Sequence, residues 1–299
     1  MSKLRVAVLG SGQIGTDLAV KLSKRIDFQV IQVSGRRPDS PGLGFLSRKG
    51  IPTTFGGIDS ILDSHKDIDL AFDCTSAQDH LNHWPLLQNV GLSVIDLTPS
   101  KIGNFFIPNV TKIEKPLNEK AININLVTCG GQAAGPLVHA VRTIASIARI
   151  EVASNIASLS AGPATRANID EYISTTENVL LKISSGIEAK AILVLNPAEP
   201  PITMQNTLYF SFINRENVDE ANLQKAITSA VRDVQRYAPG YRIRLKPTFV
   251  KDEFVISVLV RGSGDYLPEY SGNLDIINSA AIEAASEFAR VVKLQKSIG

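Results

Sequence analysis

The feature that most constrains this 299-residue chain is a short β-branched run that passes directly into a glycine-rich turn. Leu4–Leu9 is followed by a helical pattern over residues 17–23, and between them stand Gly10, Ser11, Gly12, Gln13, Ile14 and Gly15. The first glycine permits a tight turn, the second lets a pyrophosphate approach the backbone, and the third lets helix and strand pack closely. We therefore predict that residues 10–15 bind a dinucleotide; the alternative is a glycine-rich turn that binds nothing.

Strand-like and helix-like segments alternate up to about residue 130. The expected strands are 28–33, 70–74, 93–97 and 122–127, and the expected helices between them are 58–64 and 81–89. Alternation of this kind predicts parallel strands joined by crossover helices. The expectation is an α/β chain whose residues 1–130 form a Rossmann dinucleotide-binding domain.

The pattern changes after residue 130. Helix-like segments at 135–147, 168–183, 218–237 and 274–292 alternate with strand-like segments at 150–157, 190–195, 208–212, 241–246 and 254–261. Few of these resemble βαβ units, so we expect a mixed or antiparallel sheet with helices on one face. Residues 131–273 would form this second, α+β domain, and the last helix, 274–299, would pack back onto the first.

Cys129 stands where an apolar run ends and a Gly-Gly pair opens a helical pattern. Backbone N–H groups at a helix start favour a thiolate over a thiol. The alternative is a small buried residue at a strand end. A thiolate beside a dinucleotide site suggests one chemistry: the sulfur attacks an aldehyde, a nicotinamide removes hydride, and the resulting thioester passes to an acceptor.

Composition excludes several other classes. A net charge of +2, from 31 basic and 29 acidic residues, leaves no electrostatic footprint for nucleic acid. Two cysteines, Cys74 and Cys129, predict a reducing, cytoplasmic location and no disulfide framework. His80 and His83 lie three residues apart without acidic ligands at a recurring spacing, so we expect a partly exposed helix surface and no metal site. No apolar stretch approaches the roughly 20 residues that span a bilayer.

A family resemblance extends nearly from end to end. The segments that carry it are 14–18, 72–73, 75–77, 95–99, 127–133, 160–163, 165–171, 196–201, 266–268 and 272–276. In these the chain resembles the acylating acetaldehyde dehydrogenases, CoA-dependent oxidoreductases that work beside 4-hydroxy-2-oxovalerate aldolase in meta-cleavage catabolism of aromatic hydrocarbons. The resemblance implies a second domain of the semialdehyde-dehydrogenase type, used for catalysis and dimerisation.

The resemblance also implies roles for individual residues. Cys129 would be the acyl-thioester nucleophile in the oxidation of a short aldehyde to acyl-CoA, or in the reverse reduction of a thioester. Asn168 or backbone N–H groups would stabilise the oxyanion. Contacts with NAD or NADP would come from residues 11–14 and from Ser160, Ala161, Gly162, Pro163, Ala164, Thr165, Arg166, Ala167, Asn168 and Asn273. The residues themselves indicate a small-residue loop before a helix that Asn168 begins; a plain turn is the alternative.

Asn206 departs from the family, which has an aspartate thought to assist proton transfer. An amide can orient a water or a carbonyl but cannot act as a general base. We still count Asn206 as a catalytic position. Three readings stay open beside the leading one: an enzyme with another acyl carrier, a non-catalytic scaffold or sensor, and a phosphorylating semialdehyde dehydrogenase. The last needs a base histidine, and His139 lies about three helical turns beyond Cys129.

Arg37 also departs from the family, which generally has an acidic residue there. A carboxylate after the second strand holds the ribose 2′-OH of NAD, whereas Arg36 and Arg37 suit a 2′-phosphate. We therefore favour NADP over NAD, with a solvated surface pair as the alternative. The segment between Tyr241 and Tyr266 is also shorter than in enzymes that pair with the aldolase, which leaves that partner, and the acyl pocket, open.

Overall fold

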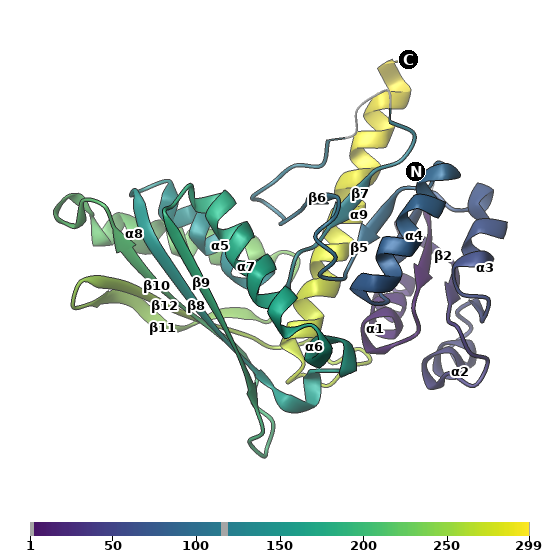
Figure 1. The fold of residues 1–299 in the computed structure, drawn as a ribbon, viewed down its shortest axis with the longest axis horizontal. Helices are drawn as coiled ribbons and strands as arrows, with labels where there is room; N and C mark the ends of the chain where they lie inside the picture. Colours follow the sequence, from purple (N-terminus) through teal and green to yellow (C-terminus); the bar gives the residue numbers. More distant parts are fainter. Residues whose placement is uncertain (1–2, 115–118, 299) are drawn as a thin grey trace.

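The computed structural model describes residues 3–114 and 119–298, without the side chains of residues 163, 164 and 293–298. Two sheets lie side by side with a long helix, α9, between them (Figure 1). The first sheet has seven strands in the order β3-β2-β1-β4-β5-β7-β6, and the second has five in the order β11-β12-β10-β8-β9. The described helices include none that is long and apolar enough to cross a membrane.

The first sheet is parallel throughout, as the alternating pattern predicts. Its strands are β1 (Leu4–Leu9), β2 (Phe28–Ser34), β3 (Thr53–Thr54), β4 (Leu70–Asp73), β5 (Val94–Asp96), β6 (Asn104–Phe105) and β7 (Asn123–Asn125). The helices are α1 (Gln13–Ser23), α2 (Pro41–Arg48), α3 (Ile58–Asp63) and α4 (Ala77–Asn89). Sequence reasoning missed α2, β3 and β6, all eight residues long or shorter. The strand order reverses between β1 and β4, and such a switch point opens a crevice at the carboxyl ends of the strands.

The second sheet is mixed, as expected. Its strands are β8 (Ile147–Ala157), β9 (Glu188–Asn196), β10 (Met204–Phe212), β11 (Tyr241–Val250) and β12 (Glu253–Val260). All neighbours pair antiparallel except β8 and β9. Figure 1 shows its helices on one face, namely α5 (Cys129–Arg142), α7 (Ile169–Ser184) and α8 (Glu220–Gln235). Alternate residues of β10 are buried, the pattern of a strand with one face on the core.

Helix α9 (Gly272–Ile298) contributes to both cores, because Ile276 packs in the second domain while Ile277, Ala281 and Phe288 pack in the first. The last helix thus packs on the core of the first sheet as well as on that of the second. Polar contacts hold the start of α9 against α1. Asn278 Nδ2 donates to Asp17 Oδ2 at 2.8 Å, and Lys21 Nζ lies 2.8 Å from Asp275 Oδ1. We place the division between the domains after residue 130, in the first turn of α5.

Candidate active site

Cys129 is the first residue of α5, six residues earlier than the predicted helix start. Thr128 caps the helix, its Oγ1 accepting from the Gly131 N–H at 2.9 Å. Just before it, Val127 has a φ of 57°, a left-handed conformation that is strained for a β-branched residue. The Val127 N–H donates to Asn125 Oδ1 at 2.9 Å, which holds this turn at the end of β7. The turn directs the Cys129 side chain into a cavity.

The cavity around Cys129 has a volume of about 100 Å³. Predicted site residues that line it are Ile14, Cys129, Thr165, Asn168 and Asn273. The remaining lining comes from Thr75, Ser76, Ala77, Leu97, Thr98, Pro99, Val127, Thr128, Tyr172, Leu274 and Ile277. Segments 75–77 and 97–99 follow β4 and β5, and the carboxyl ends of parallel strands are where α/β proteins bind ligands. From that rule, the sequence could have predicted that both segments line a ligand site, but we made no such prediction.

The glycine turn has the geometry that a pyrophosphate requires. Gly10 has a φ of +107°, and a Cβ there would lie 2.8 Å from the carbonyl oxygen of Cys74. A Cβ on Gly15 would lie 2.0 Å from the carbonyl oxygen of Gly10, whereas one on Gly12 would have no described neighbour within 4 Å. No described side chain caps α1 at Gly12, which leaves the first N–H groups of α1 without a capping side chain. An anion such as a pyrophosphate fits there.

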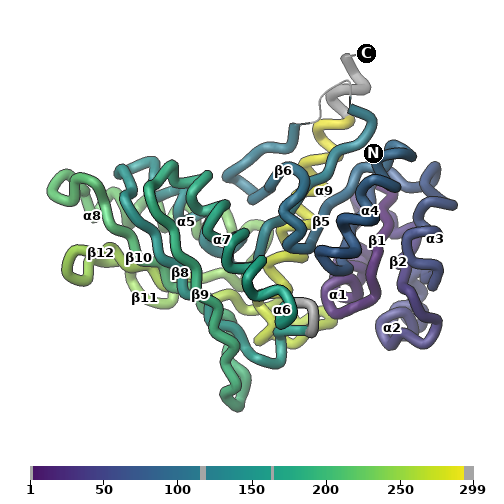
Figure 2. The backbone as a smooth tube through the Cα atoms, viewed as in Figure 1, coloured from purple at the N-terminus to yellow at the C-terminus, as the bar shows by residue number. Residues whose placement is uncertain are grey.

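The loop before α7 lies against this turn. Figure 2 shows the backbone of α6 (Pro163–Ala167) next to that of α1, and a Cβ on Gly162 would lie 4.0 Å from Gln13 Oε1. Asn273 Nδ2 donates to the Ser160 carbonyl at 3.3 Å, which connects the loop to the start of α9. Ser160 and Ala161 are buried in this loop and Gly162 is partly exposed, so the contacts of these residues with a dinucleotide stay predictions.

Other residues of this loop have different surroundings. The Arg166 guanidinium donates to the carbonyls of Ala161 and Ser158, at 3.0 and 2.8 Å, and so holds the loop itself together. Ala167 is exposed and is not part of the cavity lining. Pro163 and Ala164 open α6, but their side chains lie outside the described part of the chain. Asn168 begins α7 without a capping bond from its side chain, so the expected cap is absent at this described residue.

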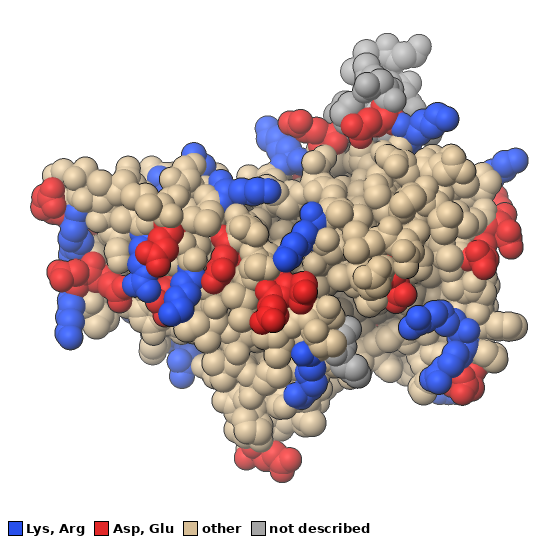
Figure 3. Space-filling view, in the orientation of Figure 1, with Lys and Arg blue, Asp and Glu red and all other residues tan. Residues whose placement is uncertain are grey.

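Arg36 and Arg37 lie just after β2, close to the glycine turn, since a Cβ on Gly35 would lie 2.5 Å from Ser11 Oγ. Their side chains are 80% and 72% exposed, and they pair with Asp79 at 3.7 Å and with Asp39 at 3.5 Å. Figure 3 shows Lys and Arg side chains gathered where Figure 1 places α2. Exposed pairs of this kind contribute little to stability, so both guanidinium groups are available to a ligand.

The Cys129 thiol faces a phenol. Its Sγ lies 3.7 Å from the hydroxyl of Tyr172, a buried residue of α7. Burial raises the pKa of Cys129 to about 11, although the Tyr172 hydroxyl and the backbone N–H groups of Cys129 and Gly130 act in the opposite direction. A helix start alone therefore does not produce the low-pKa thiol that the sequence suggests. Burial also raises the pKa of Tyr172 well above its usual range, so the phenol stays protonated.

Asn206 is not one of the residues that line the Cys129 cavity. It is fully buried on β10, and its Nδ2 donates to the Gly130 carbonyl at 3.3 Å. Its register partner on β8 is Ser154, whose buried hydroxyl has no hydrogen-bond partner among the described residues. Sequence reasoning missed both Ser154 and Tyr172. The spacing of Asn168 and Tyr172, one helical turn, was the available indication that the two share a face.

The expected partly exposed surface is wrong for His80 but not for His83, whose side chain is 14% exposed. His80 is fully buried, and its Nδ1 lies 2.9 Å from Asp73 Oδ2, at the end of β4. His83 Nδ1 lies 2.9 Å from the same oxygen, and His80 Nε2 lies 2.9 Å from Asn123 Nδ2. Burial opposes both charges, yet their hydrogen bonds outweigh it, lowering the pKa of Asp73 and raising that of His80. The described residues contain no group suited to hold a metal ion.

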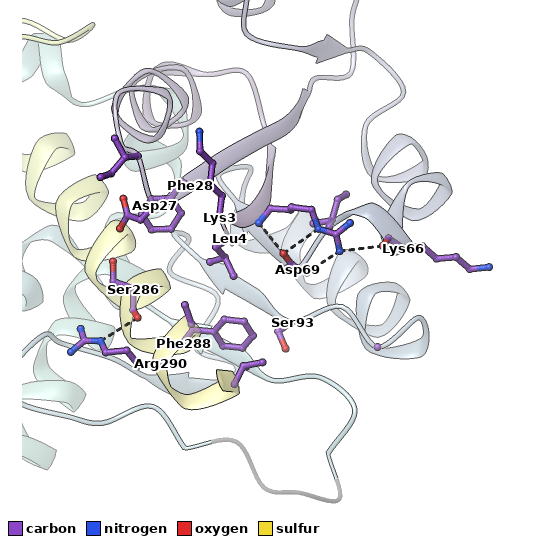
Figure 4. Close-up of a pocket in the computed structure, with 16 residues that line it drawn as sticks. Lys3, Leu4, Asp27, Phe28, Lys66, Asp69, Ser93, Ser286, Phe288 and Arg290 are labelled. Carbon is purple, nitrogen blue, oxygen red and sulfur yellow. Dashed lines mark hydrogen bonds and ion pairs between the residues drawn. The ribbon is translucent and has the colours of Figure 1, made fainter. Parts of the chain in front are cut away.

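A larger cavity, of about 1000 Å³, lies at the opposite edge of the first sheet (Figure 4). Several of its charged groups are paired: Asp69 accepts from Arg5 at 2.9 Å, and Arg290 donates to Glu283 at 3.1 Å. None of the predicted site residues lines it. The candidate active site is therefore the smaller cavity, which Cys129 and segments predicted to bind the dinucleotide line together.

Comparison with known proteins agrees with this geometry. A family model described as prokaryotic acetaldehyde dehydrogenase, dimerisation, matches residues 129–268. The chain is 44% identical over 290 residues to an acetaldehyde dehydrogenase of Geobacillus stearothermophilus, covering 97% of each. It is 47% identical over 293 residues to one of Spirochaeta aurantia, covering 98% of this chain and 97% of that one. Aspartate semialdehyde dehydrogenase with NADP from Candida albicans shares the fold, with a TM-score of 0.63, 13% identity and coverage of 96% and 100%.

Proposed function

The chain belongs to the acetaldehyde dehydrogenase family, and from this premise we propose that it oxidises a short aldehyde to acyl-CoA through a thioester on Cys129, or reduces a thioester in reverse. It is an oxidoreductase that uses a nicotinamide cofactor. The observation that supports the proposed route most directly is the position of the Cys129 thiol. It lies in a cavity lined by the segment after β1, the start of α7 and the start of α9.

The Cys129 sulfur, as the thiolate, forms a bond to the aldehyde carbon, and the carbonyl oxygen becomes an alkoxide. Asn168 lines the same cavity, and its amide N–H groups are suited to stabilise that charge. A bound nicotinamide would supply the hydride acceptor that converts this adduct to the thioester. The CoA thiolate then attacks the thioester carbon and Cys129 leaves as a thiolate. The sum is one acyl-CoA, one reduced cofactor and one proton from the CoA thiol.

Residues 10–15 would hold the pyrophosphate, and the loop of residues 160–168 with Asn273 would close over the cofactor. Because Arg36 and Arg37 replace the acidic position that reads a free ribose, we favour NADP over NAD. CoA is the proposed acyl acceptor. We also propose a homodimer, in line with the description of the matching family model, and a cytoplasmic location. An aldolase partner and a role in aromatic hydrocarbon catabolism remain predictions from the resemblance.

The alternatives have weaker support. A phosphorylating enzyme would need a base histidine at the thiol, but His139 lies ten residues along α5 and lines a separate groove beside α8. A scaffold or sensor has no need of a thiol in a cavity beside a dinucleotide site, and the relatives are named as dehydrogenases.

The decisive experiment is a measurement of NAD(P)H formation with a panel of short aldehydes, with and without CoA. We expect CoA-dependent formation of NADPH and of the matching acyl-CoA. Absence of reduced cofactor with every aldehyde, in both cofactors and in both directions, would refute the proposed activity.

A further inference from the structure

The proposed reaction needs Cys129 as a thiolate twice, once as the attacking group and once as the leaving group. Burial opposes that charge, and Asn206, the nearest counterpart of a catalytic carboxylate, is an amide that cannot take a proton. Some other group must favour the charged sulfur. The inference below rests on the proposed function and concerns which residue performs this task.

The Tyr172 side chain contacts the sulfur. It projects from α7 into the Cys129 cavity, it is 6% exposed, and its hydroxyl lies 3.7 Å from Sγ. The approach depends on Gly130, since a Cβ there would lie 2.2 Å from the Tyr172 hydroxyl and 2.8 Å from Ser154 Oγ. The Ser154 hydroxyl is 1% exposed and has no partner among the described residues. A glycine at position 130 thus leaves room for both hydroxyl groups beside the residue that follows the nucleophile.

A phenol hydroxyl can serve both protonation states of the thiol because it rotates and can either accept or donate. When Cys129 is a thiol, its S–H donates to the Tyr172 oxygen. When Cys129 is a thiolate, the Tyr172 O–H can turn and donate to the sulfur. A hydrogen bond donated to the charged form of a group stabilises that form.

We propose that Tyr172 is a catalytic residue, whose phenol O–H donates to the Cys129 sulfur whenever that sulfur is negatively charged. The first proton leaves Cys129 for solvent. Thereafter each turnover returns Cys129 as a thiolate, and the proton released is that of the CoA thiol. The cycle therefore needs no carboxylate at position 206, and the donor from α7 stabilises both the attacking and the leaving sulfur.

The test compares Tyr172→Phe with the unmodified full-length protein in the rate of Cys129 alkylation by iodoacetamide, followed on the Cys129 peptide by mass spectrometry. Between about pH 7 and 9 the rate is proportional to the thiolate fraction, so loss of a charge-favouring hydrogen bond should lower it about tenfold at each pH, one pKa unit. Turnover should fall by at least about the same factor. A merely structural effect that loosened the site would speed alkylation instead.

Tyr237→Phe is the matched control, because it removes another buried tyrosine hydroxyl that has no hydrogen-bond partner among the described residues. It should change neither rate, and NADPH binding by both variants reports that they are folded. An alkylation rate in Tyr172→Phe equal to or above that of the unmodified protein overturns the inference. Alkylation needs neither aldehyde nor CoA, so a tenfold drop supports Tyr172 even if no aldehyde is oxidised. If Tyr172→Phe oxidises aldehydes normally and its alkylation rate is unchanged, the role of Tyr172 is refuted while the proposed function stands.

Discussion

Asp73, which is buried, and Cys129, which is partly buried, both follow strands at the carboxyl ends of the first sheet, and they treat negative charge in opposite ways. Asp73, after β4, accepts hydrogen bonds from His80, His83 and the Thr75 N–H, and its pKa is lowered despite burial. Cys129, after β7, faces one neutral phenol, and its pKa is raised. Burial disfavours both charges, so the number and charge of the donors decide the outcome. The Asp73 carboxyl therefore stays ionised in the folded protein, whereas the Cys129 thiol is neutral at rest and becomes charged in the reaction.

The largest effect should come from the reactive side of this comparison. Cys129→Ser should abolish turnover while leaving the Kd for the nicotinamide cofactor nearly unchanged, because a serine hydroxyl is far from ionised near neutral pH. Steady-state kinetics and a cofactor titration measure the two quantities. Cys74→Ser is the control, because Cys74 packs against the first core. Retention of a tenth of the original rate, about 1.4 kcal/mol in barrier, would exclude Cys129 as the essential nucleophile.

On the structural side, Asp73→Asn should lower the free energy of unfolding by at least about 1–3 kcal/mol, since it removes the buried carboxylate that accepts hydrogen bonds from His80 and His83. Urea unfolding measures this loss. Asp67→Asn is the control, because its pair with Arg5 at 3.8 Å is largely exposed and should contribute far less. A loss of unfolding free energy as small as that of the control would mean that the charge of Asp73 contributes nothing to stability.

The unmodified protein and Asp73→Asn can also be compared as a function of pH. The pKa of Asp73 is lowered from its ordinary 3.8, so the stability that its charge contributes is present above that pH and is lost as the pH falls below it. The difference in unfolding free energy between the unmodified protein and Asp73→Asn should therefore shrink below about pH 4. A difference that stayed constant down to pH 3 would contradict the charged state of Asp73.

Asn206→Asp would place a carboxylate near Cys129, at a position that lacks the hydrogen-bond donors found around Asp73. The new group would face the Gly130 carbonyl, which now accepts from Asn206 Nδ2. We expect a loss of about 1–3 kcal/mol in unfolding free energy and no gain in turnover. Asn214→Asp, an exposed change, serves as the control. A rise of about 10²-fold in turnover, typical of a positioned general base, would show instead that position 206 can move the proton.

Arg36 and Arg37 extend the comparison to charges in solvent, where the smallest effect is expected. The paired change Arg36→Ile and Arg37→Asp should shift cofactor preference from NADP toward NAD by about tenfold, or ~1.4 kcal/mol, because a carboxylate repels a 2′-phosphate but accepts from ribose hydroxyls. Titration of both cofactors measures this shift. Equal Kd values for NAD and NADP in the unmodified protein would assign both arginines to the solvated surface.

The predictions that succeeded rest on local patterns. The parallel sheet and its crossover helices follow from alternating segments, and the glycine turn follows from six consecutive residues whose geometry needs no partner. The thiol at the start of α5 was likewise visible in a Gly-Gly pair. The roles of the individual site residues stay predictions until they are tested by substitution.

The sequence by itself determined the order and type of most elements, the glycine turn and the candidacy of Cys129, because hydrophobic period and backbone freedom are properties of neighbouring residues. Only the tertiary structure decided that His80 is buried on Asp73, that Tyr172 rather than a carboxylate meets the Cys129 sulfur, and that burial raises the pKa of that thiol. Each depends on side chains brought together from separate elements. Desolvation and hydrogen bonding depend on which side chains lie close together in space. The sequence of one turn of α4 or α7 does not show those neighbours.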